Sequence, residues 1–150
     1  MTITDTACIV SEAITQALEK MAFLDAVVYI GEPEIPSVSI TAEIEFTGPV
    51  SGAVRTIAGV DFAKTLAENV SGLPELTEQE CIDAMKELVN VTCGLVLPML
   101  ADSQDDVFDV TVPHLTGSKE RIYWQEFVES IDAVVLDVEG FSVATKLIIN

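Results

Sequence analysis

Residues 77–98, TEQECIDAMKELVNVTCGLVLP, form the segment that most clearly decides the fold of this chain. Thr77 and Glu80 have the spacing of a capping box, in which each side chain accepts a hydrogen bond from the backbone of the other residue, so a helix is expected to begin here. The apolar residues that follow recur at helical spacing and predict one broad buried face: Cys81, Ile82, Met85, Leu88, Val89, Cys93, Leu95 and Val96. Pro98 has no N–H to donate to the carbonyl of Gly94, so we expect the helix to kink or end at Pro98.

The opposite side of this helix carries a set of residues that we call the polar ridge: Asp83, Glu87, Asn90 and Gly94. Their spacing places them within an arc of roughly 60°. Asparagine is a poor helix former and glycine costs about 1 kcal/mol relative to alanine, so solubility alone is a weak explanation for Asn90 and Gly94. The bare backbone at Gly94 would let another molecule approach closely. The competing interpretation is that the polar ridge only keeps the exposed face of an amphipathic helix hydrated.

The chemistry of the polar ridge favours recognition over a self-contained active site. Glu87 and Asn90 lie one helical turn apart, so both side chains can reach the same external group. A carboxylate can pair with lysine or arginine, and an amide can both donate to and accept from a water molecule. Asp83 and Glu87 are also spaced like a metal-binding or acid–base pair, but no further acid or histidine converges on them in the sequence, and His114 is the chain's one histidine. No nucleophile-elbow or phosphate-binding loop motif is present either.

The polar ridge carries a resemblance to a known family. Asp83, Glu87 and Asn90, followed by Pro113, have the residue types and intervals of the motif of the CheC/CheX/FliY family of bacterial chemotaxis phosphatases. The single copy of the motif and the order of elements around it are most similar to CheX. The matched positions cover only residues 83–113, but four fixed residue types at fixed intervals are rarely met by chance.

The resemblance implies a function. In the family, the phosphorylated receiver domain of the response regulator CheY supplies the aspartyl phosphate, the Mg²⁺ and a lysine. Glu87 would pair with that lysine, and Asn90 would hold a water molecule in line for attack. Asp83 and Gly94 would belong to the surface that contacts the receiver, and Pro113 would be structural. This chain would bind no cofactor or metal of its own, and it would form a homodimer.

Two alternatives stay open at the level of sequence. The first is a non-catalytic module with the same fold, in which the polar ridge docks a receiver without accelerating hydrolysis. The second is a dimerisation domain in which the polar ridge has no partner.

The composition limits the partners of this chain. It has 25 acidic and 7 basic residues and a formal net charge of -18, so nucleic acid and anionic membrane surfaces would be repelled. No apolar run is long enough to span a bilayer, and the N-terminus lacks the pattern of a signal peptide, so a cytoplasmic protein is expected. Cys8, Cys81 and Cys93 fall at apolar helical positions and are expected to be buried, reduced thiols.

Local patterns predict the remaining elements. We expect a first helix capped by Thr4 or Asp5, a hairpin of strands at residues 37–46 and 50–58, a short helix at 62–70 capped by Asp61, a strand at 108–112 closed by Pro113, an edge strand at 122–127, and a final hairpin of strands 133–138 and 141–149. Strict alternation in the strand at 37–46 predicts one solvent-facing side: Ser39, Thr41, Glu43 and Glu45. This order predicts a single α+β domain over residues 1–150, an antiparallel sheet with helices packed on it.

Overall fold

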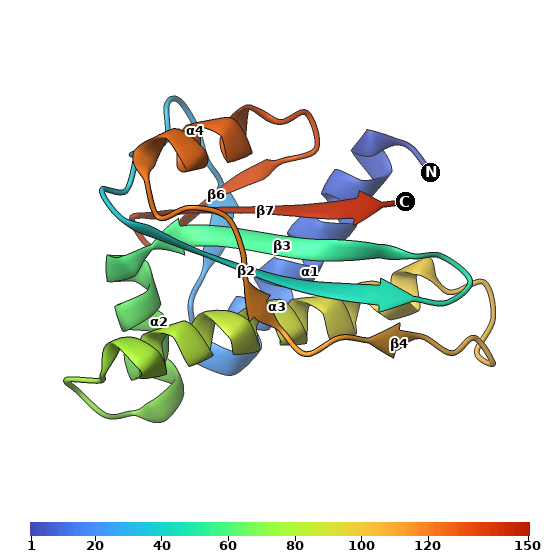
Figure 1. Cartoon of the computed structure of the whole chain (residues 1–150), viewed down its shortest axis with the longest axis horizontal. Helices are drawn as coiled ribbons and strands as arrows, with labels where there is room; N and C mark the ends of the chain where they lie inside the picture. Colours follow the sequence, from blue (N-terminus) through green and yellow to red (C-terminus); the bar gives the residue numbers. More distant parts are fainter.

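The computed structural model describes all 150 residues as an antiparallel sheet with helices on both faces (Figure 1). The seven strands follow the order β1-β6-β7-β3-β2-β4, and β5 pairs with β2 beside β4. The elements are α1 (Ile3–Ala22), β1 (Ala26–Val28), β2 (Ser39–Thr47), β3 (Gly52–Gly59), α2 (Val60–Ser71), α3 (Glu78–Leu100), β4 (Asp109–Val110), β5 (His114–Leu115), α4 (Arg121–Glu129), β6 (Val134–Val138) and β7 (Phe141–Ile149). The expected α+β class is confirmed, since α1, α2 and α3 share the main core with the sheet.

The helix predicted from residues 77–98 is α3. Thr77 Oγ1 accepts from the Glu80 backbone N–H at 3.2 Å, and Glu80 Oε1 accepts from the Thr77 N–H at 3.2 Å, so the capping box is confirmed. The helix continues to Leu100, so an end at Pro98 is wrong. Because Pro98 lies in the last turn, only the backbone hydrogen bond to the Gly94 carbonyl is lost. The Ala101 N–H donates to the Leu97 carbonyl at 3.1 Å and completes the last turn of the helix.

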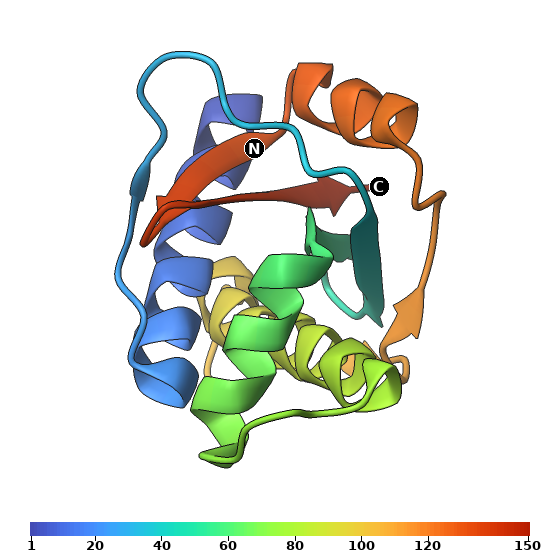
Figure 2. The ribbon, with the colours of Figure 1, turned by 90° about the vertical axis from the view of Figure 1, so that its left-hand side faces the viewer.

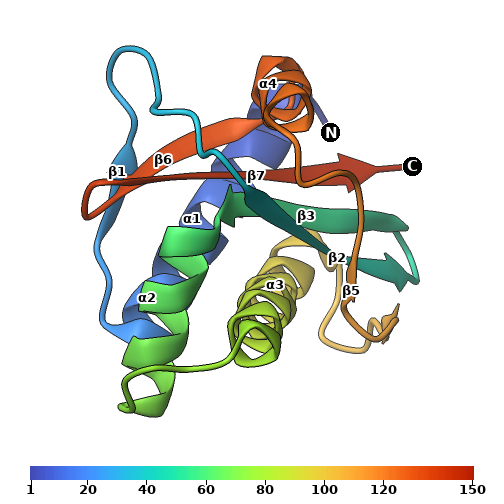
Figure 3. The same ribbon diagram turned by 60° about the vertical axis from the view of Figure 1, so that its left-hand side comes forward.

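The apolar face of α3 lies between α1, α2 and the sheet. Met85, Leu88, Val89 and Val96 are completely buried there, and the other predicted apolar residues are buried or partly buried. Figure 3 shows α2 and α3 on one side of the strands and α4 alone on the other. Each fully buried aliphatic side chain contributes about 1.5–3 kcal/mol, so this face fixes the orientation of the whole helix.

Strand β2 is buried on both sides, which differs from the half-buried strand expected from its alternation. Ile40, Ala42, Ile44 and Phe46 of the expected inner side belong to the main core, whereas Val38, expected on the same side, precedes β2 and is exposed. Ser39, Thr41 and Glu43 are buried as well, and of the predicted solvent-facing set only Glu45 is exposed. The reason is a long-range one: β5 pairs with β2 at Glu43, and residues 115–119 continue along its edge. This cover comes from a segment more than sixty residues away in sequence, so no local pattern in β2 could predict it.

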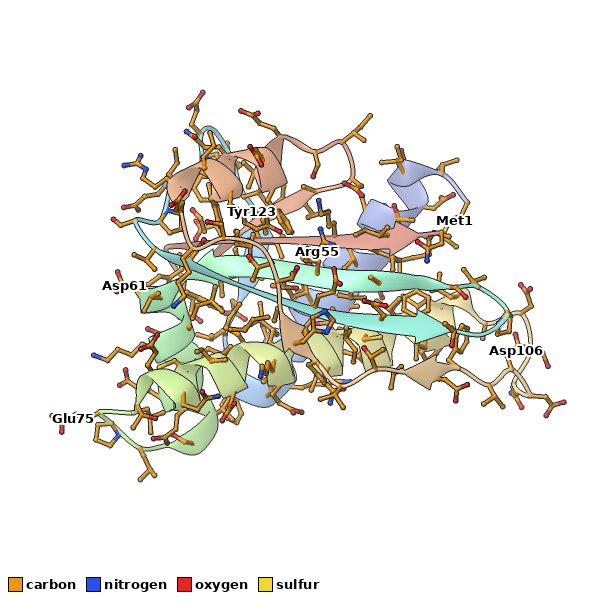
Figure 4. All side chains as sticks on the ribbon, viewed as in Figure 1. Met1, Arg55, Asp61, Glu75, Asp106 and Tyr123 are labelled. Carbon is orange, nitrogen blue, oxygen red and sulfur yellow. The ribbon has the colours of Figure 1, made fainter.

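Residues 121–129 form helix α4, so the edge strand predicted at 122–127 is wrong. Trp124 and Phe127, spaced as on one helical face, are buried against Ile57 of β3 and Ala144 of β7 on the outer face of the sheet. Tyr123 (labelled in Figure 4) packs where a side chain at Gly117 would otherwise lie. Gly117 also has a φ of 69°, so this turn favours glycine, and α4 is tied to residues 115–119.

Smaller corrections concern the element ends. Helix α1 is capped by Thr2 rather than by Thr4 or Asp5. Asp5 is the third residue of the helix, and its carboxylate completes a capping box by accepting from the Thr2 backbone N–H. Helix α2 begins after Gly59, which places Asp61 in the first turn instead of at the cap. Shifts of this size are common at helix ends.

The sheet differs from expectation at its edges. The strand expected at residues 108–112 is reduced to β4, and Pro113 lies in the link between β4 and β5. Strand β1 was not predicted, because its three residues are too short for a readable alternation. Both predicted hairpins are confirmed, as β2 pairs with β3 and β6 pairs with β7 in antiparallel register. By length and hydropathy, none of the helices could cross a membrane.

The three cysteines test the packing of α1 and α3. Cys81 and Cys93 are buried as expected, and burial raises the pKa of both thiols, that of Cys93 to about 11. Cys8 is exposed on α1, so the expectation that it is buried is wrong.

We predict that one thiol of the native protein reacts rapidly with a disulfide reagent at pH 8, and that all three react in denaturant. Cys8→Ser should remove the fast reaction, and a second fast thiol in the native protein would contradict this packing.

Candidate functional site

The polar ridge lies on the solvent-facing side of α3. Asp83, Glu87, Asn90 and Gly94 are all exposed. At 1.5 Å of rise per residue, the polar ridge extends over about 16 Å of the helix. Because the opposite face is anchored in the core, these side chains start from a rigid backbone.

The members of the polar ridge differ in their contacts. Asp83 Oδ1 accepts a hydrogen bond of 2.9 Å from Gln79 Nε2 one turn earlier, which holds its carboxylate. The side chains of Glu87 and Asn90 form no hydrogen bond or ion pair within the chain. The contact between Gln79 and Asp83 was not predicted from the sequence, although residues four apart on a helix are neighbours. The structure therefore offers a free carboxylate and a free amide one turn apart.

Gly94 leaves an open position at the end of the polar ridge. A Cβ added there would meet no atom within 4 Å, so the glycine is not required by internal packing. Its carbonyl also lacks the usual helix donor, because residue 98 is proline. Gly94 thus exposes backbone that a bound molecule could approach.

Pro113 comes from a different part of the fold. It is partly buried in the link between β4 and β5, at the edge of the sheet beside β2. The structure therefore brings Asp83, Glu87 and Asn90 together on one helix and does not place Pro113 on that helix.

One group of side chains has the composition of a metal site, and it contains no member of the polar ridge. Ligand atoms of Glu43, Glu45 and His114 lie within 4.8 Å of one another. Glu43 is already engaged: it forms an ion pair with Arg55 (labelled in Figure 4), and its Oε1 lies 3.4 Å from His114 Nε2. This cluster could not be predicted from the sequence because it depends on the register of β2 with β3 and β5.

The fold and the exposed site define an α+β protein that presents a short polar surface on a rigid helix. The sequence matches the family described as chemotaxis phosphatase CheX over residues 40–137, about two thirds of the chain. The chain therefore belongs to the CheX family. The match includes Asp83, Glu87, Asn90 and Pro113 within its bounds.

Solved structures support the same fold. CheX from Desulfovibrio desulfuricans is similar with a TM-score of 0.73 and 16% identity, covering 97% of this chain and 99% of that one. CheX from Vibrio vulnificus has a TM-score of 0.71 and 17% identity, with 100% and 97% covered. A chain of the CheX–CheY–BeF3–Mg²⁺ complex from Borrelia burgdorferi has a TM-score of 0.65 and 16% identity, with 97% of each chain covered. A comparison with curated protein sequences finds no significant match.

The openness of Gly94 predicts the effect of a substitution on stability. Gly94→Ala adds a methyl group where nothing clashes and removes the entropic cost of glycine in a helix. The free energy of unfolding, measured with urea, should rise by about 0.5–1 kcal/mol. A decrease would mean that Gly94 is required by the fold, contrary to the open surface described above.

Proposed function

We propose that this chain is a cytoplasmic phosphatase for the aspartyl phosphate of a CheY-type response regulator, and that residues 1–150 are one CheX-like phosphatase domain. Membership of the CheX family supports the activity. The complex from Borrelia burgdorferi, in which CheX occurs with CheY, BeF3 and Mg²⁺, supports the choice of partner. The observation that carries the proposal is the pair of unengaged side chains, Glu87 and Asn90, on the exposed face of a firmly packed helix.

Glu87 docks the receiver. Its carboxylate is unpaired in a chain with a formal net charge of -18, so it gains most from a partner that offers a cation. We assign that cation to the receiver's lysine, as the family resemblance implies. The pair fixes the position of α3 across the phosphorylation site.

Asn90 positions the water. Its amide oxygen accepts from the water while its NH₂ group donates to a phosphoryl oxygen, so the water oxygen is aimed at phosphorus. Attack forms one P–O bond, breaks the bond between phosphorus and the aspartyl oxygen, and releases inorganic phosphate and a free aspartate. Phosphoryl transfer depends mainly on alignment and charge neutralisation, so one oriented water is a sufficient contribution from this chain.

The metal belongs to the receiver in this proposal. Asp83 and Glu87 are the carboxylates of the polar ridge, and one is held by Gln79 while the other is assigned to a lysine. Mg²⁺ bound by the receiver neutralises charge on the phosphoryl group. This chain supplies only the docking carboxylate and the amide.

The other motif residues have supporting roles. Asp83 and Gly94 extend the contact surface on either side of the central pair. Pro113 is structural: it lies between two short edge strands, where the absence of an N–H discourages pairing with another strand.

The central prediction separates catalysis from docking. Asn90→Ala should lower the rate of phosphate loss from a Mg²⁺-loaded phospho-receiver by ~10-fold or more, with binding largely retained, because the substitution removes alignment of the water. Glu87→Ala should weaken binding. Glu12→Ala, at an exposed glutamate of α1, is the matched control and should change neither quantity.

The same experiment distinguishes the alternatives. If Asn90→Ala leaves the rate unaltered while Glu87→Ala weakens binding, the chain is a receiver-binding module without catalytic function. If neither substitution has an effect, the polar ridge is not the site.

We also propose a homodimer formed through the sheet edge at β1. Val27 and Val28 are 61% and 65% exposed on this edge strand, which pairs with β6 on one side only. The aromatic residues at 122–127 are a weaker basis, because Trp124 and Phe127 are buried in the chain's own core.

The double substitution Val27→Lys, Val28→Lys tests this dimer. Charges on an edge strand oppose strand pairing, so light scattering should report a dimer for the wild type and a monomer for the variant. Retention of the dimer would move the interface away from β1, and a monomeric wild type would end the proposal.

A further inference from the structure

The side chains of Glu43, Glu45 and His114 form a second candidate site, which we call the edge cluster. Glu43 and Glu45 alternate along β2 with residues of the main core, so both side chains lie on the face of the sheet opposite α3. His114 joins them from β5, which pairs with β2 at Glu43. Figure 2 shows the segment that contains β5 running beside β2 at the edge of the sheet and leading to α4. The edge cluster is therefore separate from the polar ridge.

The contact between His114 and Glu43 has the length expected between two ligands of one metal ion. Nε2 of His114 lies 3.4 Å from Oε1 of Glu43, which is long for a hydrogen bond. Two ligands of a tetrahedral Zn²⁺ ion, each about 2.0–2.2 Å from the metal, lie about 3.3–3.6 Å apart. The ligand atoms of all three residues lie within 4.8 Å of one another, and Glu45 is exposed, so its carboxylate is free to move closer.

The surroundings of His114 favour a free lone pair on Nε2. Its Nδ1 lies 3.5 Å from the carbonyl oxygen of Val112, so we assign the ring proton to Nδ1. Histidines that bind metals commonly donate their other ring N–H to a backbone carbonyl in this way. The lone pair on Nε2 then faces a carboxylate oxygen of Glu43, and both atoms are acceptors. A positive charge belongs between them, and it is either a second ring proton or a metal ion.

Glu43 is held in place by a group outside the edge cluster. It is only 7% exposed, and Arg55 on the neighbouring strand β3 pairs with its Oε2. This contact leaves Oε1 available, and hydrogen bonds of this kind orient the carboxylates of metal sites. The next cation on the same face, Lys146 of β7, is engaged elsewhere: its Nζ donates to Ser130 Oγ at 3.2 Å and lies 4.5 Å from the centre of the Phe127 ring.

The charges and donor atoms of the edge cluster favour a divalent transition metal. Two carboxylates face one guanidinium, so negative charge is in excess, and the formal net charge of -18 attracts cations from a distance. An imidazole nitrogen suits Zn²⁺ and similar ions, whereas Mg²⁺ prefers a shell of oxygen ligands. The ion that fits here is therefore different from the Mg²⁺ that the receiver supplies.

We propose that the edge cluster binds Zn²⁺ through Glu43 Oε1, the Glu45 carboxylate and His114 Nε2, with a water molecule in the fourth position. The ion ties β5 to β2, where the strands pair at only two positions. This proposal departs from the expectation, drawn from the family resemblance, that the chain binds no metal of its own. It does not depend on the proposed function, because the polar ridge lies on the other side of the sheet.

Because His114 is the chain's one histidine, its ring resonances report on this site alone. Wild-type protein treated with a chelator is titrated with Zn²⁺ in an excess of Mg²⁺, and these resonances are followed by NMR. They should move to a single bound form at one equivalent of Zn²⁺. The melting temperature should rise by at least ~5 °C when free Zn²⁺ exceeds the Kd about a hundredfold. This measurement needs no substitution that could disturb folding.

Single substitutions identify the ligands. His114→Ala and Glu45→Gln should each raise the Kd for Zn²⁺, measured by calorimetry, at least ~10-fold, because each removes one of three protein ligands. Glu12→Gln, at an exposed glutamate of α1, is the matched control for the carboxylate. Cys8→Ser removes the exposed thiol. Both control variants should bind Zn²⁺ like the wild type.

The other outcomes overturn the site. If the His114 ring resonances do not respond to Zn²⁺, the contact with Glu43 is an ion pair of a protonated histidine, and the edge cluster holds no metal. If Zn²⁺ binds and only Cys8→Ser lowers the affinity, the metal is bound by the thiol. If His114→Ala weakens binding and Glu45→Gln does not, the site with three protein ligands is wrong. Each of these results leaves the phosphatase proposal standing, because Asn90→Ala tests that proposal separately.

Discussion

The burial of one face of α3 is the constraint on which the rest of the structure depends. Met85, Leu88 and Val89 are held by α1, α2 and the sheet, so the helix can neither rotate nor slide without exposing them. The opposite face must then point to solvent. The backbone positions of Glu87 and Asn90 are thereby fixed relative to each other before any partner arrives, which lowers the entropic cost of aligning a water molecule on a bound phosphoryl group.

This arrangement suits a site whose central residues, Glu87 and Asn90, lie outside the main surface cavities. The proposed reaction takes its electrophile, its metal and its leaving group from the receiver, so the site on this chain needs only to dock and to orient. A convex surface on a helix suits that task because it can enter a partner's site. The strong negative charge of the chain favours partners that offer a cation and disfavours polyanions.

Sequence reasoning succeeded where the determinants are local. The capping box, the buried face and the polar ridge all lie on one helix, so 3.6-residue periodicity was enough to predict them. It failed where contacts between distant segments of the chain determine the local structure or the burial of a residue. The aromatic residues at 122–127 form a helix because Trp124 and Phe127 have a pocket on the outer face of the sheet. Thr41 is buried because a distant segment covers it. The cavity between β2, the starts of α2 and α3, and residues 115–119 is built from four separate segments, so no local pattern could predict it.

The central claim is that this chain accelerates hydrolysis of a receiver's aspartyl phosphate. The most direct measurement is the first-order rate constant of phosphate loss from a Mg²⁺-loaded phospho-receiver over a series of concentrations of the wild-type chain. If this chain is a phosphatase, the rate constant should rise with its concentration and saturate as all of the receiver becomes bound. If the two proteins bind but the rate constant stays at the value measured for the receiver alone, the proposed phosphatase activity is contradicted.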